Sequence, residues 1–497
     1  MRVRDDEVFQ ALAPVAVVGQ DVVEQLEDVD PMAWAAVDVH EHELAVRQAD
    51  QGAVSLADIR KDRFELSHDR PSTSQLVSRL DSMTRTSRPT TVAGASDVTG
   101  PPQIGVCLSG GGFRAAFFGL GVLRYLAEAG RLADVVAVSA VSGGSITAAV
   151  LADRWPDLQR ESFSDDAFER HVTAPVVAAV TEHNMRNRGL ARWAVTRVAP
   201  RRRRIGATVG ATIASHLLRT RKVAELPPGL QIVLTSTDLV SGRAFRVSRD
   251  FIGGWQFGYA PTPPGLSLGT TIAASTAVPF LFPPVPLRTR DLGLNDGTPP
   301  ELALVDGGVY DNLGLEWFQG WDRGRPALAR EVDFVLVVDA SGPLTVNAKR
   351  YGWVTSLHRS QQAQYAQTRA SRVRWFVDQL IAGTMHGLYI PIDRDPAAFV
   401  PPSHVTALPQ VADGALPTGF ASALGGLRTD LDRFLPEEAT LLMYHAYWTA
   451  HVRLRHIRPE LAVAAPRWRD MTDMSPAEAA RLRGLLADGS RQRMFRR

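Results

Sequence analysis

The chain has 497 residues, of which 45% are hydrophobic and 22% are charged, and its formal net charge is +2. These values are typical of a soluble globular protein, and so small a net charge gives no reason to expect nucleic acid as a partner. The single cysteine, Cys107, excludes an internal disulfide framework, and its apolar neighbours predict a buried thiol.

The first residues lack the apolar core and cleavage site of a secretory signal. No apolar stretch reaches the roughly 20 residues that span a bilayer. We therefore expect a cytoplasmic protein, with peripheral contact to a membrane as an open possibility.

Residues 1–83 show a scattered helical pattern and predict a mainly helical N-terminal appendage. Residues 84–102 are rich in Pro, Gly, Ser and Thr, which is typical of a linker or loop. From residue 103 to 345 short apolar runs alternate with helical patterns, which predicts an α/β core. Residues 346–497 are predicted to form a mainly helical C-terminal region that packs on this core.

Four apolar runs in the core predict strands buried on both faces, as in a mostly parallel sheet covered by helices. They are Ile104–Leu108, Val135–Val141, 232–234 and 334–338, and a further strand is expected near residues 388–392.

Residues 103–153 have the pattern of a strand, a glycine loop, a helix, a second strand, a sharp turn and a second helix. The first helix is predicted over residues 114–129, with Gly130 just past its end. A right-handed crossover makes the two strands parallel. The polar stretches that follow them, at 109–114 and 140–144, then meet at the edge where open α/β sheets bind ligands.

The second polar stretch is Ala140-Val141-Ser142-Gly143-Gly144. It is similar to G-x-S-x-G, the tight strand-to-helix turn that exposes a serine hydroxyl and needs small neighbours. Ala140 departs from the strict pattern. The alternative is that Ser142 simply caps the following helix.

The first polar stretch carries Gly110, Gly111, Gly112 and Arg114. Glycines let consecutive backbone N–H groups point at one developing oxyanion, and the N-terminus of the next helix adds positive potential. The lysine of a phosphate-binding P-loop is absent. Arg114 is expected to pair with a structural carboxylate or with an anionic substrate group such as phosphate.

A third stretch, Asp306-Gly307-Gly308, follows another apolar run. By itself it is typical of an ordinary turn.

Together the three stretches resemble the patatin-like phospholipase family in content and order. Residues 234–239 and 273–279 are also similar to segments of that family, and the glycine loop resembles that of the cytosolic phospholipase A2 branch. The resemblance covers about residues 103–340. It implies a three-layer α/β/α core with an N-terminal appendage and a helical C-terminal region.

The resemblance also implies a serine–aspartate dyad without histidine. Ser142 is then the nucleophile, Asp306 the base, and the three glycines the oxyanion donors, while Arg114 contacts a phosphate headgroup. The expected substrate is a phospholipid or another acyl lipid, cleaved through an acyl-enzyme, and no metal or organic cofactor is implied.

Three alternatives to this reaction remain at the level of sequence. The first is a catalytically weak or regulated lipid-binding module on the same fold. The second is a Ser-Asp-His esterase, for which His386 is the best-placed histidine after Asp306. The third is a protease or small-ester esterase that uses the same residues and differs only in its pocket.

Residues 154–230 form a predicted cap or insertion. Arg201-Arg-Arg-Arg204 and the cations Arg219, Arg221 and Lys222 flank its apolar stretch at 205–218. This stretch is either a core helix or an interfacial helix, and the second interpretation predicts membrane contact through residues 201–222.

Overall fold

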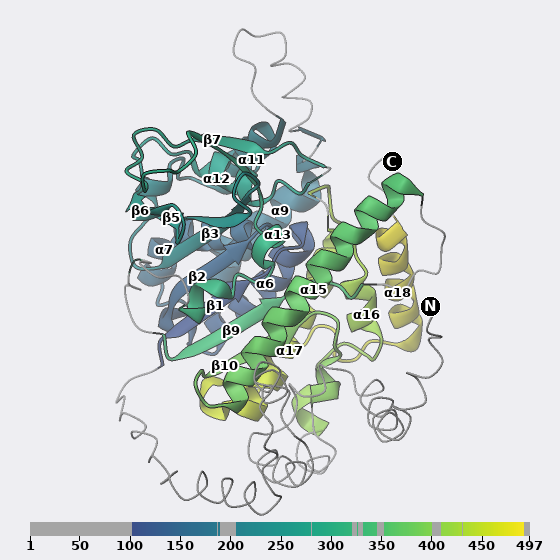
Figure 1. Cartoon of the computed structure of the whole chain (residues 1–497). Coiled ribbons are helices and arrows are strands. Elements are labelled where there is room, and N and C mark those ends of the chain that lie inside the picture. The colour runs from purple at the N-terminus through teal and green to yellow at the C-terminus, as the bar shows by residue number, and fades with distance from the viewer. Residues whose placement is uncertain are drawn as a thin grey trace, which may run out of the picture. The chain divides into compact units, whose positions relative to one another are not determined.

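The central feature of the computed structural model is one mixed, 10-stranded sheet (Figure 1). The model describes residues 102–491 except 186, 189–204, 280, 321–325, 327–331, 345–351, 400–408 and 430. The predicted N-terminal appendage, nearly all of the predicted linker, and Arg201–Arg204 lie outside the described residues.

The strands occur in the following order along the chain: β1 (Ile104–Leu108), β2 (Val135–Val141), β3 (Gln231–Asp238), β4 (Arg243–Val247), β5 (Phe251–Gly254), β6 (Gly258–Pro261), β7 (Val285–Arg288), β8 (Glu301–Asp306), β9 (Phe334–Asp339) and β10 (Gly387–Pro391). The α-helices among the described residues are α6 (Gly112–Glu128), α7 (Gly143–Arg160), α8 (Asp165–Phe168), α9 (Ala174–Glu182), α11 (Ile205–Leu217), α12 (Leu268–Ser275), α13 (Gly308–Asp311), α14 (Glu316–Gln319), α15 (Trp353–Ile381), α16 (Phe420–Gly425), α17 (Pro436–Ile457) and α18 (Pro476–Arg491).

The sheet has the order β10-β9-β1-β2-β3-β4-β5-β6, and its first five strands are parallel. This confirms the predicted parallel core. Strands β4, β5 and β6 continue the sheet in antiparallel fashion, and the β7–β8 hairpin joins it through β3. The sequence did not predict this antiparallel part, because its short strands lack long apolar runs.

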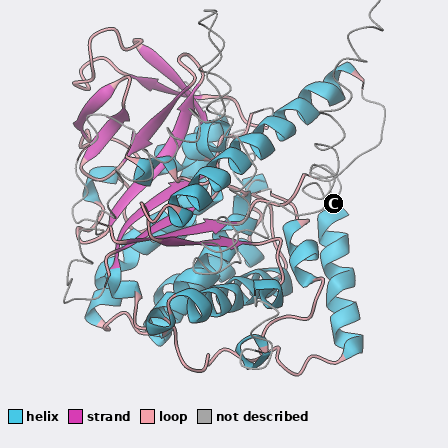
Figure 2. Cartoon of the chain, turned by 60° about the horizontal axis from the view of Figure 1, so that its bottom comes forward, coloured by secondary structure: helices cyan, strands magenta, loops and turns pink. Residues whose placement is uncertain are grey.

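Helices cover the sheet on both faces, as expected for a three-layer core (Figure 2). Along β1 the side chains alternate between two apolar cores. Val106 and Leu108 pack into the larger one, with α6, α7 and α17, whereas Cys107 packs into a second core with Val373 and Phe376 of α15. Cys107 is fully buried, as predicted.

The C-terminal region completes this core. Strand β10 adds a parallel strand beside β9, and α17 packs against α6, where the rings of Tyr125 and Tyr447 meet edge to face at 5.3 Å. Gly130 ends α6 with φ = 66°, the left-handed conformation expected of a glycine at this position.

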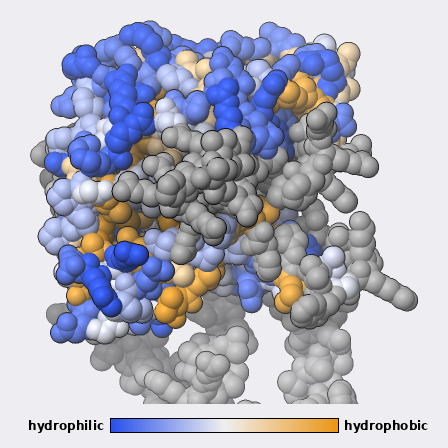
Figure 3. All heavy atoms as spheres, turned by 90° about the horizontal axis from the view of Figure 1, so that it is seen from above, coloured by the Kyte–Doolittle hydropathy of each residue, from blue (hydrophilic) through white to orange (hydrophobic). Residues whose placement is uncertain are grey.

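One side of helix α11 packs into the molecule. Val209, Ile213 and Leu217 are buried, and α11 packs against α12 so closely that a Cβ on Gly210 would overlap the carbonyl oxygen of Gly269. The described residues of α11 therefore support a core helix, not an interfacial one. On the surface seen in Figure 3, hydrophilic side chains predominate and hydrophobic ones gather in patches.

Candidate active site

Ser142 occupies a strained turn between β2 and α7, with φ = 52°. Its hydroxyl makes no capping hydrogen bond to α7, so the capping alternative is wrong. A Cβ on Gly143 would overlap the carbonyl oxygen of Gly112, and one on Gly144 would overlap that of Leu108. Both glycines are therefore required by close backbone packing. Ala140 is fully buried in β2, so its methyl group fits where the strict motif has glycine.

Asp306 reaches Ser142 through an unusual strand arrangement. Strand β4 occupies one side of β3 along residues 234–238, and β2 occupies the other side up to the Val141–Thr235 pair. Strand β8 then takes over that second side, antiparallel, and pairs Asp306 with Ser236. Strands β2 and β8 consequently meet end to end, which brings Ser142 and Asp306 together.

The Asp306 carboxyl is shielded from solvent, and burial raises its pKa to about 6. The backbone N–H of Gly308 donates to Oδ1 at 2.8 Å and opposes this rise. The neighbouring Ser142 hydroxyl also lowers its pKa. Oδ2 has no hydrogen-bond partner of ordinary geometry among the described residues, which leaves it available to take a proton.

The glycine loop lies directly against Ser142, because a Cβ on Gly110 would be 3.2 Å from the Cβ of Ser142. The N–H of Gly110 donates to the carbonyl of Asn312 at 2.9 Å and is therefore occupied. The N–H groups of Gly111 and Gly112 have no hydrogen-bond partner among the described residues. The structure thus offers two free donors where the sequence predicted three.

Ser275, which the site prediction missed, holds the turn in place. Its Oγ accepts the backbone N–H of Ser142 at 3.0 Å and donates to the carbonyl of Thr235 at 2.7 Å. It also lies 2.8 Å from the Oγ of Ser145. The segment at 273–279 carried part of the family resemblance, but only the fold shows that its serine contacts the turn.

Arg114 is buried and binds the C-terminal region. Its Nη1 donates to the carbonyls of Gly425 at 2.6 Å and Leu427 at 2.7 Å, and burial lowers its pKa to about 10. These contacts differ from both predicted partners, a structural carboxylate and a substrate phosphate. They give Arg114 a structural role next to the glycine loop.

Helix α15 brings a further side chain to the site. A Cβ on Gly308 would lie 2.5 Å from Oδ1 of Asn312 and 2.9 Å from the ring of Tyr365, so a larger residue there would displace these side chains. Burial and the neighbouring Asp306 both raise the pKa of the Tyr365 hydroxyl.

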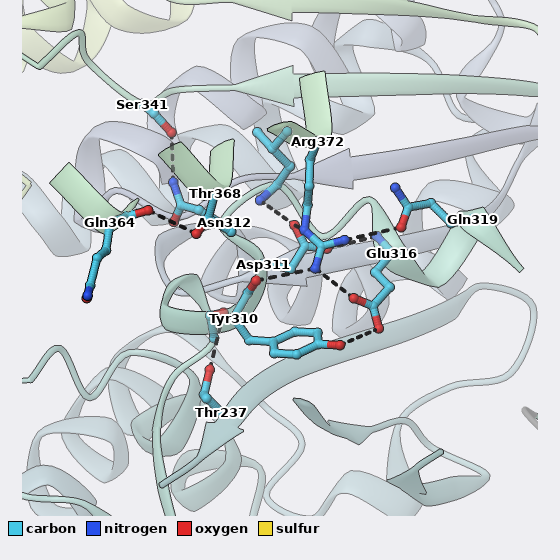
Figure 4. A network of polar contacts seen from close by, with 12 residues as sticks. Thr237, Tyr310, Asp311, Asn312, Glu316, Gln319, Ser341, Gln364, Thr368 and Arg372 are labelled. Atoms are coloured by element: carbon cyan, nitrogen blue, oxygen red, sulfur yellow. Dashed lines mark hydrogen bonds and ion pairs between the residues drawn. The ribbon is translucent and has the colours of Figure 1, made fainter. Parts of the chain in front are cut away.

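Two partly buried arginines hold α15 in this position. Arg369 pairs with Asp339 at 2.5 Å, and Arg372 pairs with Glu316 at 2.7 Å and with Asp311 at 3.2 Å. Figure 4 shows the second of these networks, which joins α15 to the segment that follows Asp306.

His386 lies far from this site. It directly precedes β10, and its carbonyl accepts the N–H of Val335 near the start of β9. Since the strands β9, β10, β1 and β2 are parallel, this is the edge of the sheet opposite Ser142. The geometry excludes His386 as the third member of a triad.

Within the described ranges no group of three His, Cys, Asp or Glu side chains is arranged to hold a metal ion. Likewise, none of the described helices has the length and hydropathy needed to cross a bilayer.

Residues 106–317 match the family model of patatin-like phospholipase. Among solved structures, the chain is similar to human GIVD cytosolic phospholipase A2 (13% identity, 72% of this chain and 62% of that chain, TM-score 0.41). It is also similar to VipD from Legionella pneumophila (15% identity, 78% and 75%, TM-score 0.26) and to the type III effector protein ExoU (15% identity, 73% and 54%, TM-score 0.24). The chain thus spans less than two thirds of the length of the human enzyme. No curated protein matches it by sequence.

Proposed function

Because residues 106–317 form a patatin-like phospholipase domain, we propose that the chain is a lipid acyl hydrolase of phospholipase A type, with Ser142 as nucleophile and Asp306 as base. The observation that carries this proposal is the end-to-end meeting of β2 and β8. It pairs a strained serine with a buried carboxyl whose pKa, about 6, suits a general base at neutral pH.

In the first half of the reaction, the ionised Asp306 accepts the hydroxyl proton while Ser142 Oγ attacks the ester carbonyl. The N–H groups of Gly111 and Gly112 and the positive end of α6 support the oxyanion that forms. As the tetrahedral intermediate collapses, the alcohol leaves with the proton from Asp306, and the acyl group stays on Ser142.

In the second half, a water molecule gives a proton to Asp306 and attacks the acyl-enzyme. The fatty acid leaves and Ser142 recovers its proton. Both side chains are shielded from bulk water, so the interactions that steer these proton transfers are strong.

A panel of lipids tests the reaction class. Purified wild type and Ser142→Ala are incubated with phospholipids of different headgroups and with triacylglycerol, and the products are identified by mass spectrometry. We expect free fatty acid, with a lysolipid from phospholipids, from the wild type only. Equal release by both proteins would refute the proposal, and a wild type that binds these lipids without releasing fatty acid would favour the binding module.

Replacing His386 with alanine tests the alternative esterase mechanism. We expect the hydrolysis rate to stay within severalfold of wild type, because His386 lies at the opposite edge of the sheet. A loss as large as that of Ser142→Ala would overturn the dyad assignment.

Ser275→Ala tests the support of the nucleophile. It leaves the N–H of Ser142 and the hydroxyl of Ser145 without their buried partner, which costs about 1–3 kcal/mol of stability. We expect kcat and the rate of labelling by a fluorophosphonate to fall about 10- to 100-fold, with KM nearly unchanged, because the nucleophile is misplaced.

Thr276→Val is the matched control for this variant, since the Thr276 hydroxyl bonds only within its own segment. Equal labelling rates for the two variants would show that Ser275 has a purely structural role.

A further inference from the structure

Large apolar side chains that are exposed in this structure are unevenly distributed. Nine of them among the described residues are more than a third exposed, and seven lie at the edge of the sheet that carries Ser142. We call these seven the apolar rim: Leu239 (52% exposed), Val240 (59%), Trp255 (46%), Leu281 (39%), Val309 (37%), Leu344 (38%) and Leu357 (48%).

Three members of the rim lie on two neighbouring turns. Leu239 and Val240 directly follow β3, whose carboxyl end lies at the Ser142 edge because β3 is parallel to β2. Trp255 directly follows β5, which runs in the same direction as β3. The two turns are joined by Arg243, whose guanidinium lies 5.0 Å from the centre of the Trp255 ring.

The remaining members surround the candidate dyad from other segments. Val309 follows Gly308 in α13, and Leu281 lies four residues after Ala277, whose carbonyl accepts the N–H of Asp306. Leu344 follows β9 at its carboxyl end, and Leu357 lies two helical turns before Tyr365 on α15.

The two exposed apolar residues outside the rim lie at the opposite edge. Ile381 (43% exposed) ends α15 just before β10 begins, and Ile457 (41%) ends α17 beside Arg458, which covers the ring of Phe334 at the start of β9. Most of the exposed apolar side chains therefore lie at the edge formed by the carboxyl ends of the parallel strands, which is the edge that carries Ser142.

We propose that the apolar rim docks on the surface of a lipid bilayer and thereby brings Ser142 to its substrate. This inference rests on the proposed function and names the surface through which the site meets its lipid. The rim comes from separate turns and from α13 and α15, so its members form no continuous groove for a single peptide, whereas a bilayer surface can meet them together. A tryptophan next to an arginine suits the boundary between acyl chains and headgroups.

The rim would contact a membrane through exposed apolar side chains, whereas the contact predicted for residues 201–222 relied on an apolar helix flanked by cations. Val209, Ile213 and Leu217 of α11 are buried and the helix packs against α12, so these apolar side chains are not available to a bilayer in this fold. Binding through the rim depends on apolar area, so it needs no anionic lipid and withstands high salt.

The test compares two sets of substitutions in the full-length chain. Sedimentation with phosphatidylcholine vesicles is measured for wild type, for the rim variant Leu239→Ser/Val240→Ser/Trp255→Ser and for the control variant Ile381→Ser/Ile457→Ser. We expect the rim variant to bind at least roughly tenfold more weakly and the control to stay within about twofold of wild type. Raising the salt concentration is expected to change wild-type binding by less than about twofold.

A second assay separates this proposal from the proposed function. Hydrolysis of a water-soluble short-chain ester is expected to be the same in the rim variant and the wild type, because none of the three residues belongs to the dyad. A wild type that binds vesicles normally but hydrolyses neither ester nor lipid would contradict the proposed reaction and leave the docking proposal standing. Wild-type vesicle binding by the rim variant would overturn the docking proposal, as would binding that requires anionic lipid and is lost at high salt. If the rim variant instead lowers the oligomeric mass and leaves vesicle binding unchanged, the rim is a contact between copies of the chain and the proposal also fails.

Discussion

Replacing Ser142 with alanine is expected to lower fatty-acid release at least about 10³-fold and to abolish covalent labelling by a fluorophosphonate. The reason is chemical, because no acyl-enzyme can form without the Oγ atom. Alanine meets the same backbone strain at φ = 52° as serine does, so we expect the variant to fold normally. Its thermal unfolding should therefore match that of the wild type.

Ser139 supplies the matched control for this experiment. It lies three residues earlier in β2, is fully buried, and its hydroxyl makes no hydrogen bond to any described residue. Ser139→Ala is expected to keep near-normal activity and labelling. Labelling that persists in Ser142→Ala would show that another residue is the nucleophile.

Replacing Asp306 with asparagine is expected to lower the hydrolysis rate about 10³-fold. The amide keeps an oxygen for the N–H of Gly308, but it cannot accept the proton of Ser142. In the wild type the base must be ionised, so kcat/KM should rise about tenfold per pH unit below pH 6 and level off above it. A profile that is flat through pH 6 would contradict the assignment of Asp306 as the base.

The same substitution is expected to stabilise the protein at neutral pH. The pKa of Asp306 is raised from 3.8 to about 6 on folding, so the native state holds this proton more tightly than the unfolded state. The free energy of unfolding therefore falls as the pH rises through this window, and the ionised carboxylate costs up to about 3 kcal/mol above it.

Chemical denaturation of wild type and Asp306→Asn at several pH values measures this difference. We expect the variant to be more stable at pH 7 and the gain to disappear near pH 4. A variant that is both inactive and destabilised at pH 7 would show that Asp306 has a structural role instead.

Local sequence was sufficient to predict the parallel half of the sheet. Strands β1, β2 and β9 match the predicted runs almost residue for residue, because strands buried on both faces need continuous apolar side chains. The antiparallel strands β4 to β6 were missed, since four or five residues of mixed polarity carry no such pattern.

Within the candidate site, the sequence by itself determined the residues that we propose for the chemistry: a serine in a tight turn, a loop of glycines, and an aspartate followed by two further glycines. Only the tertiary structure decided how they meet. The end-to-end arrangement of β2 and β8, the occupied N–H of Gly110 and the carbonyl partners of Arg114 join segments up to 313 residues apart. A turn or a strand is specified by its own residues and their near neighbours, whereas such contacts depend on how the whole chain packs.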